Sequence, residues 1–191
     1  MELNDYLDYQ CQDLAKTLEE STRLNRDPLL KMYDNIFKTL VLKDRKVAII
    51  GNGGSASEST HIATEFVSKC ILDHKPLQVI SLTDSMSSIT ALGNDYGFEN
   101  IFARQIEAYL RKGDVLICLS TSGKSTNILR ALEIAISKGV HSYLWTGNHD
   151  LNLPGVTIIR ATSKSTPRIQ EVHLFWGHQM AEYVERRINN V

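Results

Sequence analysis

Short apolar runs alternate with longer stretches of helical spacing from residue 47 to the end of the chain. The apolar runs predict strands at 47–50, 77–82, 115–119, 140–145 and 156–159. Apolar residues at helical spacing predict helices near 57–70, 85–92, 100–111 and 125–138, and a last helix at about 168–188. This alternation is typical of an α/β fold with a parallel five-stranded sheet flanked by helices. Ligands of such proteins bind beyond the carboxyl ends of the strands.

The first 43 residues contain helical patterns but no strand pattern. Leu3, Leu7, Leu14 and Leu18 lie on one side of a helical projection, and a second helix is predicted to begin near Pro28. These extra helices either cover the sheet or form a bundle between subunits, and their spacing fits both. No linker divides the chain. We therefore expect a single domain at 1–191, with an N-terminal helical segment at 1–43 and an α/β core at 44–191.

Composition narrows the class of protein. The net charge is −1, with both signs scattered along the 191 residues, which argues against a broad basic surface for nucleic acid. No apolar run approaches membrane-spanning length, and the acidic N-terminus is unlike a secretory signal, so a cytoplasmic protein without membrane contact is expected. The three cysteines have no CxxC spacing, which argues against a disulfide framework.

The segment GNGGSAS at 51–57 follows the first predicted strand and leads into a helix. Its glycines allow the backbone to approach a ligand, and Ser55 or Ser57 is predicted to cap the helix. The first amides of a helix have no intrahelical partner, so a phosphate fits there. His61 and Glu65 stand four residues apart on one face of this helix and form a candidate pair of metal ligands.

A second loop of similar composition, STSGKST at 120–126, follows the third predicted strand. Turn chemistry between a strand and a helix explains either loop alone. Two such loops in one sheet are better explained by an anion pocket formed by backbone amides and hydroxyls, because such a pocket needs no large positive charge.

Both loops also resemble nucleotide motifs. The glycine pattern at 51–56 suits a dinucleotide site with Asp84 as the ribose-binding acid, but Asp84 lies farther away than the usual ~20 residues. The sequence at 123–125 matches the end of a P-loop, but Cys118 stands where that motif requires its first glycine. Neither motif explains His61 and Glu65.

The last predicted helix contains RIQEVH at 168–173, followed by His178. Gln170 and His178 differ by about 80° around an ideal helix, whereas His173 and His178 differ by about 140°. Gln170 therefore shares a face with His178, and His173 does not. A lone histidine is more often structural than a ligand, and it is the company of the other motifs that favours a functional His178.

Several other polar residues have simple structural explanations. Asn94 and Asp95 suit turn chemistry, although their side chains also hydrogen-bond sugar hydroxyls. His74, His141 and His149 have no acidic partner at ligand spacing and are interpreted as surface or packing residues.

Taken together, GNGGSAS with His61 and Glu65, GND at 93–95, STSGKS at 120–125 and RIQEVH with His178 resemble the phosphoheptose isomerases of the sugar isomerase domain family. The resemblance covers nearly the whole chain. It implies a nucleotide-fold-like parallel α/β sandwich of three layers. It also implies interconversion of sedoheptulose 7-phosphate and D-glycero-D-manno-heptose 7-phosphate, which leads to the heptoses of lipopolysaccharide and capsule.

The resemblance further implies roles for individual residues. One zinc ion per subunit is expected on His61, Glu65, Gln170 and His178, with Glu65 and His178 as the acid/base pair. Imidazole nitrogen and carboxylate oxygen suit zinc, and the glutamine is the unusual ligand. The substrate-binding residues that the match implies are Asn52, Gly53, Gly54, Ser55, Asn94, Asp95, Ser120, Thr121, Ser122, Ser125 and Gln170.

The chain departs from the family pattern at three places. Lys124 replaces an asparagine, Lys69 replaces a frequent arginine, and Thr166-Pro167 stands where some members carry an acid. A lysine cannot clamp an anion bidentately as arginine does, so these changes bear on which sugar is bound rather than on the reaction class.

Relatives of this kind also include non-catalytic domains that sense phosphosugars or bind a replication initiator. Such members tend to lose the metal and acid/base residues, so the presence of Glu65 and His178 favours an enzyme. The resemblance also implies a homotetramer whose N-terminal helices pack between subunits and whose active sites are shared by neighbouring chains.

Overall fold

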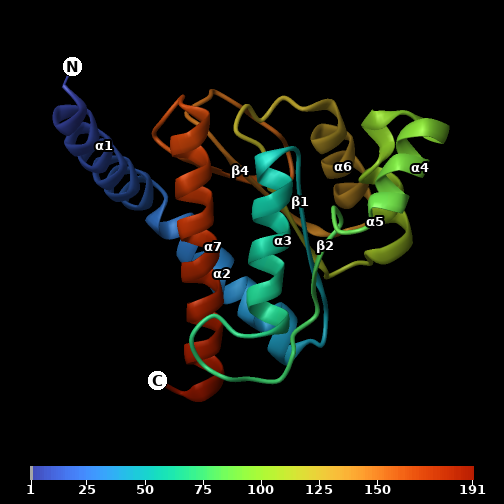
Figure 1. Ribbon diagram of the computed structural model, residues 1–191. Helices are drawn as coiled ribbons and strands as arrows, with labels where there is room; N and C mark the ends of the chain where they lie inside the picture. The colour runs from blue at the N-terminus through green and yellow to red at the C-terminus, as the bar shows by residue number, and fades with distance from the viewer. Residues whose placement is uncertain (1) are drawn as a thin grey trace.

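The computed structural model describes residues 2–191 and shows a parallel β-sheet between two layers of helices (Figure 1). All neighbouring strands pair in parallel, in the order β2-β1-β3-β4-β5. This confirms the predicted α/β class with five parallel strands. The strands are β1 (Val47–Gly51), β2 (Val79–Ser81), β3 (Val115–Leu119), β4 (His141–Thr146) and β5 (Val156–Arg160).

Helices cover both faces of the sheet, and each face has its own apolar core. The core on one face joins the sheet to helices α1 (Leu3–Leu24), α2 (Arg26–Phe37), α3 (Gly54–Val67) and α7 (Thr166–Asn189). The core on the other face joins it to α4 (Met86–Tyr96), α5 (Ala103–Tyr109) and α6 (Thr126–Ser137). Two short helical segments complete the chain, η1 (Lys38–Leu42) and η2 (Phe98–Asn100).

The central strands explain why the chain contains unbroken apolar runs. Val47 and Ile49 of β1 belong to one core, whereas Ala48 and Ile50 belong to the other. Successive side chains of a strand point to opposite faces, so a strand that is covered on both faces must be apolar at every position. Burial of each large aliphatic side chain stabilises the fold by about 1.5–3 kcal/mol.

The strand order places the predicted loops next to each other. β1 is paired with β2 on one side and β3 on the other, so the chain changes direction across the sheet between them. Ligands of open α/β sheets bind at such a switch point, beyond the carboxyl ends of the strands. Gly51 at the end of β1 is in register with Leu119 at the end of β3. The segments 51–57 and 120–126 therefore leave the sheet as neighbours.

Several element boundaries differ from the predicted ones. α3 begins at Gly54, not near residue 57, because Gly53 has φ +54° and turns the chain directly from β1 into the helix. Ser55 and Ser57 therefore lie inside the helix, and the predicted serine cap is wrong. α2 begins at Arg26, so Pro28 is its third residue. α4 extends to Tyr96, where Gly97 with φ +84° ends it.

The first helix extends away from the sheet at its N-terminal end (Figure 1). Leu3 is 71% exposed and Leu7 is 54% exposed, whereas Leu18 packs against the core. Farther along, the guanidinium of Arg168 on α7 binds the Asp13 carboxylate at 2.6 Å. The C-terminal half of α1 is thus fixed to α7, and the apolar side of its N-terminal half is uncovered in one copy of the chain.

Candidate active site

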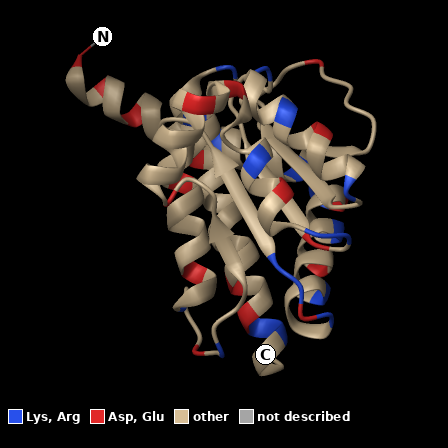
Figure 2. Cartoon of the chain, turned by 90° about the vertical axis from the view of Figure 1, so that its right-hand side faces the viewer, with Lys and Arg blue, Asp and Glu red and all other residues tan. Residues whose placement is uncertain are grey.

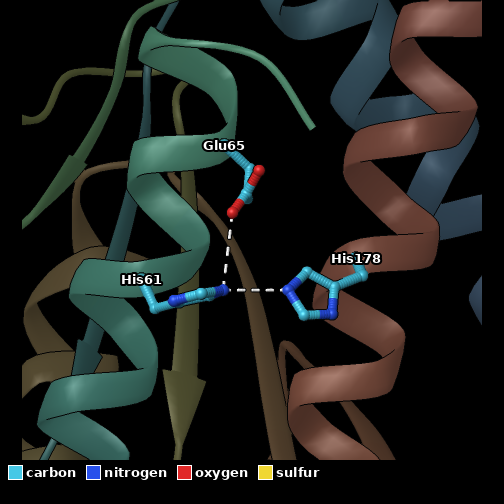
Figure 3. A group of neighbouring side chains, drawn as sticks. All are labelled: His61, Glu65 and His178. Carbon is cyan, nitrogen blue, oxygen red and sulfur yellow. Dashed lines mark hydrogen bonds and ion pairs between the residues drawn. The ribbon is translucent and has the colours of Figure 1, made fainter. Parts of the chain in front are cut away.

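His61, Glu65 and His178 meet between helices α3 and α7 (Figure 3). The Nε2 atoms of the two histidines are 2.9 Å apart, and Glu65 Oε1 lies 3.4 Å from His61 Nε2. His61 and Glu65 are one turn apart on α3, as their spacing predicted. His178 reaches them from the last helix, although it is separated from His61 by most of the chain.

This arrangement fits a metal ion. One ligand atom from each of the three residues lies within 4.8 Å of the others. Two imidazole nitrogens and a carboxylate oxygen are a donor set that zinc commonly uses, and zinc usually takes a fourth ligand. The His61 side chain is 51% exposed and the Glu65 side chain is 18% exposed, so the group lies open on one side. The part of the chain that the structure describes thus offers a three-residue candidate metal centre.

Gln170 connects the last helix to the first loop. Its Nε2 atom donates a long hydrogen bond of 3.4 Å to the Ser55 hydroxyl. A Cβ atom at Gly54 would lie 2.4 Å from Gln170 Nε2, so the glycine provides the space for the amide. Gln170 is thus beside the first loop and on the helix of His178. Its predicted role as a fourth metal ligand stays a prediction.

The first loop offers fewer free amides than an open helix end. The amide of Ser55 donates to the Asn52 carbonyl at 3.0 Å, and that of Ala56 donates to the Gly53 carbonyl at 3.0 Å. An anion at this end therefore depends on the remaining amides and on hydroxyl groups. Gly53 and Gly54 are exposed, and the Ser55 side chain is buried under the loop.

The second loop is organised by its own hydroxyls. The amide of Gly123 donates to Ser120 Oγ at 3.2 Å, and the amide of Lys124 donates to Ser122 Oγ at 3.2 Å. Each of these hydroxyls still has its own hydrogen to donate to an anion. Thr121 and Ser125 are partly exposed on the same loop. Lys124 is exposed at its tip, where its charge adds to the field around the loop.

Asn94 and Asp95 lie in the last turn of α4 rather than in a turn between elements. Asn94 Nδ2 donates to Asp95 Oδ1 at 2.8 Å, and both residues are exposed. Within residues 2–191, no hydrogen bond joins either residue to the two loops. Their predicted contact with substrate stays a prediction.

Two other histidines, His173 and His74, lie outside the candidate metal group. His173 packs beside Trp145 and Trp176 in the core, and burial lowers its pKa to about 3. It lies outside the candidate metal group, as its angle from His178 predicted. His74, interpreted from the sequence as a surface or packing residue, has a buried side chain whose Nε2 lies 3.3 Å from a Glu185 carboxylate oxygen. Spacing along one helix could not reveal that contact.

Two polar side chains near the site were not singled out from the sequence. Burial raises the pKa of Glu58 on α3 to about 7, and a hydrogen bond with the Ser55 side chain acts in the opposite direction. The pKa of the Cys70 thiol is raised to about 11, mainly by burial and to a smaller extent by the negative charge of Glu65. Glu58 precedes His61 by three residues, a helical spacing that could have drawn attention to it.

A cavity of about 250 Å³ borders the first loop at the carboxyl ends of the strands. Asn52 and the glycines on either side of it line one wall, and apolar side chains from α4 and its neighbours line the other.

Lys and Arg are interspersed with Asp and Glu on the side of the molecule shown in Figure 2. None of the helices in residues 2–191 is long and apolar enough to cross a membrane.

Comparison with known proteins decides the family. The model of the SIS (sugar isomerase) domain matches residues 9–143. The phosphoheptose isomerase of Aneurinibacillus thermoaerophilus is 37% identical over 97% of this chain and 96% of its own length. The chain belongs to the phosphoheptose isomerases of the SIS domain family. It is therefore an isomerase, as the resemblance implied. A phosphoheptose isomerase of Burkholderia pseudomallei is 46% identical over 75% of this chain and 74% of the relative.

Solved structures agree with this membership. The phosphoheptose isomerase from Neisseria gonorrhoeae superposes with a TM-score of 0.86 at 28% identity, covering 96% of this chain and 99% of that one. The enzyme from Francisella tularensis gives a TM-score of 0.89 at 26% identity, covering 97% and 100%. The similarity thus includes the N-terminal helices as well as the sheet.

Proposed function

We propose that this isomerase interconverts sedoheptulose 7-phosphate and D-glycero-D-manno-heptose 7-phosphate, in the biosynthesis of heptoses for lipopolysaccharide or capsule. The observation that carries the proposal is the meeting of His61, Glu65 and His178, in a fold where two loops rich in hydroxyls leave the sheet as neighbours. The names of the relatives support the substrate class.

The two loops suit the phosphate end of such a substrate. Ser55 and the hydroxyls of Ser120, Thr121, Ser122 and Ser125 supply donors, and the exposed glycines of the first loop allow close approach. Asn52, Asn94 and Asp95 are proposed to line the sugar end. Because the phosphate is remote from C1 and C2, its binding energy can position those carbons against the catalytic residues.

Glu65 and His178 are proposed to transfer the protons. Conversion of the ketose to the aldose removes a proton from C1 and returns one to C2, while the hydroxyl protons rearrange through an enediol. Glu65 Oε1 and a ring nitrogen of His178 both lie in the same group of atoms within 4.8 Å, so one substrate can be in reach of both. A carboxylate and an imidazole are sufficient for both transfers.

A zinc ion is proposed at this site, held by His61, Glu65, His178 and Gln170. When bound, zinc polarises a carbonyl or hydroxyl oxygen of the substrate as a Lewis acid. His61 is proposed as a zinc ligand only. Glu65 and His178 are proposed both as zinc ligands and as proton-transfer groups, and each must loosen one of these roles to perform the other.

The test of this function combines a chelator with metal restoration. Purified protein is assayed with sedoheptulose 7-phosphate as isolated, after stringent chelation, and after addition of zinc. We expect activity to disappear and return. Undiminished activity after metal removal contradicts the zinc site only. A folded, zinc-loaded protein without activity supports the alternative of a non-catalytic phosphosugar sensor or scaffold.

A homotetramer is proposed for the same protein. The exposed leucines in the N-terminal half of α1 and a groove of about 420 Å³ between α2 and α7 are surfaces that another copy can cover. Light scattering should give the mass of four chains. Leu7→Glu should lower that mass, and an unchanged mass would exclude α1 from the interface.

A further inference from the structure

Asn52 and Asn127 form a reciprocal amide pair between the two loops. Asn52 Nδ2 donates to Asn127 Oδ1 at 2.9 Å, and Asn127 Nδ2 donates to Asn52 Oδ1 at 2.8 Å. Turning over one amide alone sets donor against donor and acceptor against acceptor, so each side chain fixes the orientation of the other. Asn127 is the second residue of α6 and is 2% exposed. It therefore acts on a ligand through Asn52 rather than by direct contact.

The Asn52–Asn127 pair lies just beyond the last paired residues of β1 and β3. Backbone pairing between β1 and β3 ends at Gly51 and Leu119, and the chain then diverges into α3 and α6. Among residues 2–191, no other hydrogen bond joins segment 51–57 to segment 120–127. The two amides are thus the polar connection between the loops beyond the last strand residues.

We propose that Asn127 is a positioning residue for the phosphate pocket, because its pairing with Asn52 sets the spacing between segments 51–57 and 120–126. Asn127 has this role only if both loops bind the phosphate as proposed above. A phosphate held by donors from both loops requires them within about 0.5 Å of their productive positions. The reciprocal pair supplies this constraint, since neither amide can rotate without breaking both hydrogen bonds.

A double-mutant cycle tests the coupling. Asn52→Ala, Asn127→Ala and the double variant are compared with the wild type by KM and kcat for sedoheptulose 7-phosphate and by calorimetric titration of inorganic phosphate. Each single variant should weaken phosphate binding and raise KM by at least ~10-fold, as expected for the loss of a buried hydrogen-bonded pair. The double variant should be no worse than the poorer single variant, because both changes remove the same interaction.

Two further variants sharpen the result. Asn127→Asp keeps the size of the side chain but sets a charged acceptor against Asn52 Oδ1, so phosphate binding should weaken more than in Asn127→Ala. This variant also replaces Asn127→Ala in the cycle if the alanine protein does not fold by circular dichroism. Asn35→Ala is the matched control, since it removes an amide that bonds the Tyr143 hydroxyl at 3.0 Å, outside both loops. Its KM and phosphate affinity should equal those of the wild type.

Three results overturn the proposal. They are an unchanged phosphate affinity in Asn127→Ala, fully additive losses in the double variant, and a lower kcat with unchanged KM and phosphate affinity. A lower kcat with unchanged KM and phosphate affinity would mean that the variant contains fewer folded molecules, not that its phosphate pocket is altered. If the wild type does not convert sedoheptulose 7-phosphate, the proposed function fails, while the phosphate titrations still decide the role of the pair. A wild type that converts the sugar phosphate but does not bind inorganic phosphate overturns the positioning role and leaves the proposed function intact.

Discussion

Gly177 of α7 packs directly against Ile62 of α3. A Cβ atom at Gly177 would lie 2.5 Å from two carbon atoms of the Ile62 side chain, which is closer than side chains tolerate. These two residues immediately precede His178 and follow His61 in the chain. The absence of a side chain at Gly177 therefore allows the two helices to approach until the two histidines meet at 2.9 Å.

Gly177→Ala should separate α3 from α7 and weaken the candidate metal centre. Overpacking of a core costs about 1–3 kcal/mol, of which the better helix propensity of alanine recovers up to about 1 kcal/mol. Zinc affinity, measured by competition with a chromophoric chelator, should fall at least ~10-fold, since metal ligands tolerate only small displacements.

Gly93→Ala provides the matched control for this change. Gly93 is also a helical glycine, but a Cβ atom there would make an ordinary contact of 3.8 Å with Ile101. This variant should be as stable as the wild type or more stable by up to about 1 kcal/mol, with unchanged zinc affinity. If Gly177→Ala binds zinc as Gly93→Ala does, the close packing of Gly177 is not what assembles the site.

Replacement of the proposed acid/base residues should slow turnover without unfolding the chain. Glu65→Gln and His178→Gln are each expected to lower kcat at least ~10²-fold, the low end for loss of general acid/base catalysis. Zinc content and circular dichroism are measured on the same samples. A variant that is folded, retains its metal and turns over normally removes that residue from the mechanism.

Stability should fall in mild acid because His173 is buried in its neutral form. Its pKa is lowered to about 3 in the fold, so between pH 6.5 and 3 the unfolded chain binds a proton that the folded chain excludes. Folding stability therefore decreases as the pH falls. From pH 7.5 to 5.5 this histidine should cost about 1.4 kcal/mol.

The check compares wild type with His173→Leu by urea unfolding in the presence of a chelator. The other five histidines are common to both proteins, so their contributions largely cancel. The free energy of unfolding of wild type should decline relative to that of His173→Leu over this range. A difference independent of pH would contradict the buried neutral state.

Glu185 should anchor the segment that follows α3. Its carboxylate accepts the backbone amides of Cys70, Ile71 and Leu72 at 2.6, 2.9 and 2.8 Å. Burial opposes its ionisation, yet these amides hold the pKa of Glu185 below its usual value. Glu185→Gln should cost about 2–3 kcal/mol of folding stability, as expected for hydrogen bonds to a buried charge, and should speed amide exchange at 70–72.

Glu182→Gln serves as the comparison for Glu185. Glu182 pairs with Arg186 at the surface, where an ion pair contributes at most about 1 kcal/mol. If both glutamine variants lose equally little stability, Glu185 does not hold the segment in place.

The strands, the helices and part of the site could be predicted from local spacing. His61 and Glu65 share a helix face because they are four residues apart, and both strand runs that precede the loops are apolar because both sheet faces are covered. The same spacing misplaced the start of α3, since serine near a predicted helix end resembles a cap, whereas the positive φ of Gly53 begins the helix earlier.

Contacts between distant segments could not be predicted in this way. Nothing in the local pattern shows that Gly177 fits against Ile62, that Asn127 pairs with Asn52, or that His74 lies beside Glu185. Each of these depends on which helices become neighbours and on how closely they pack, which the sheet order determines. Family resemblance placed His178 with His61 before the structure did, through motif matching rather than through spacing.

The central claim is that this chain moves a carbonyl group between C2 and C1 of a seven-carbon sugar phosphate. Its most direct test is to follow sedoheptulose 7-phosphate by NMR with zinc-loaded wild-type protein and with zinc-loaded Glu65→Gln. We predict that aldose anomeric signals appear with the wild type and form at least ~10²-fold more slowly with the variant. Absence of aldose from folded, zinc-loaded wild-type protein would contradict the account.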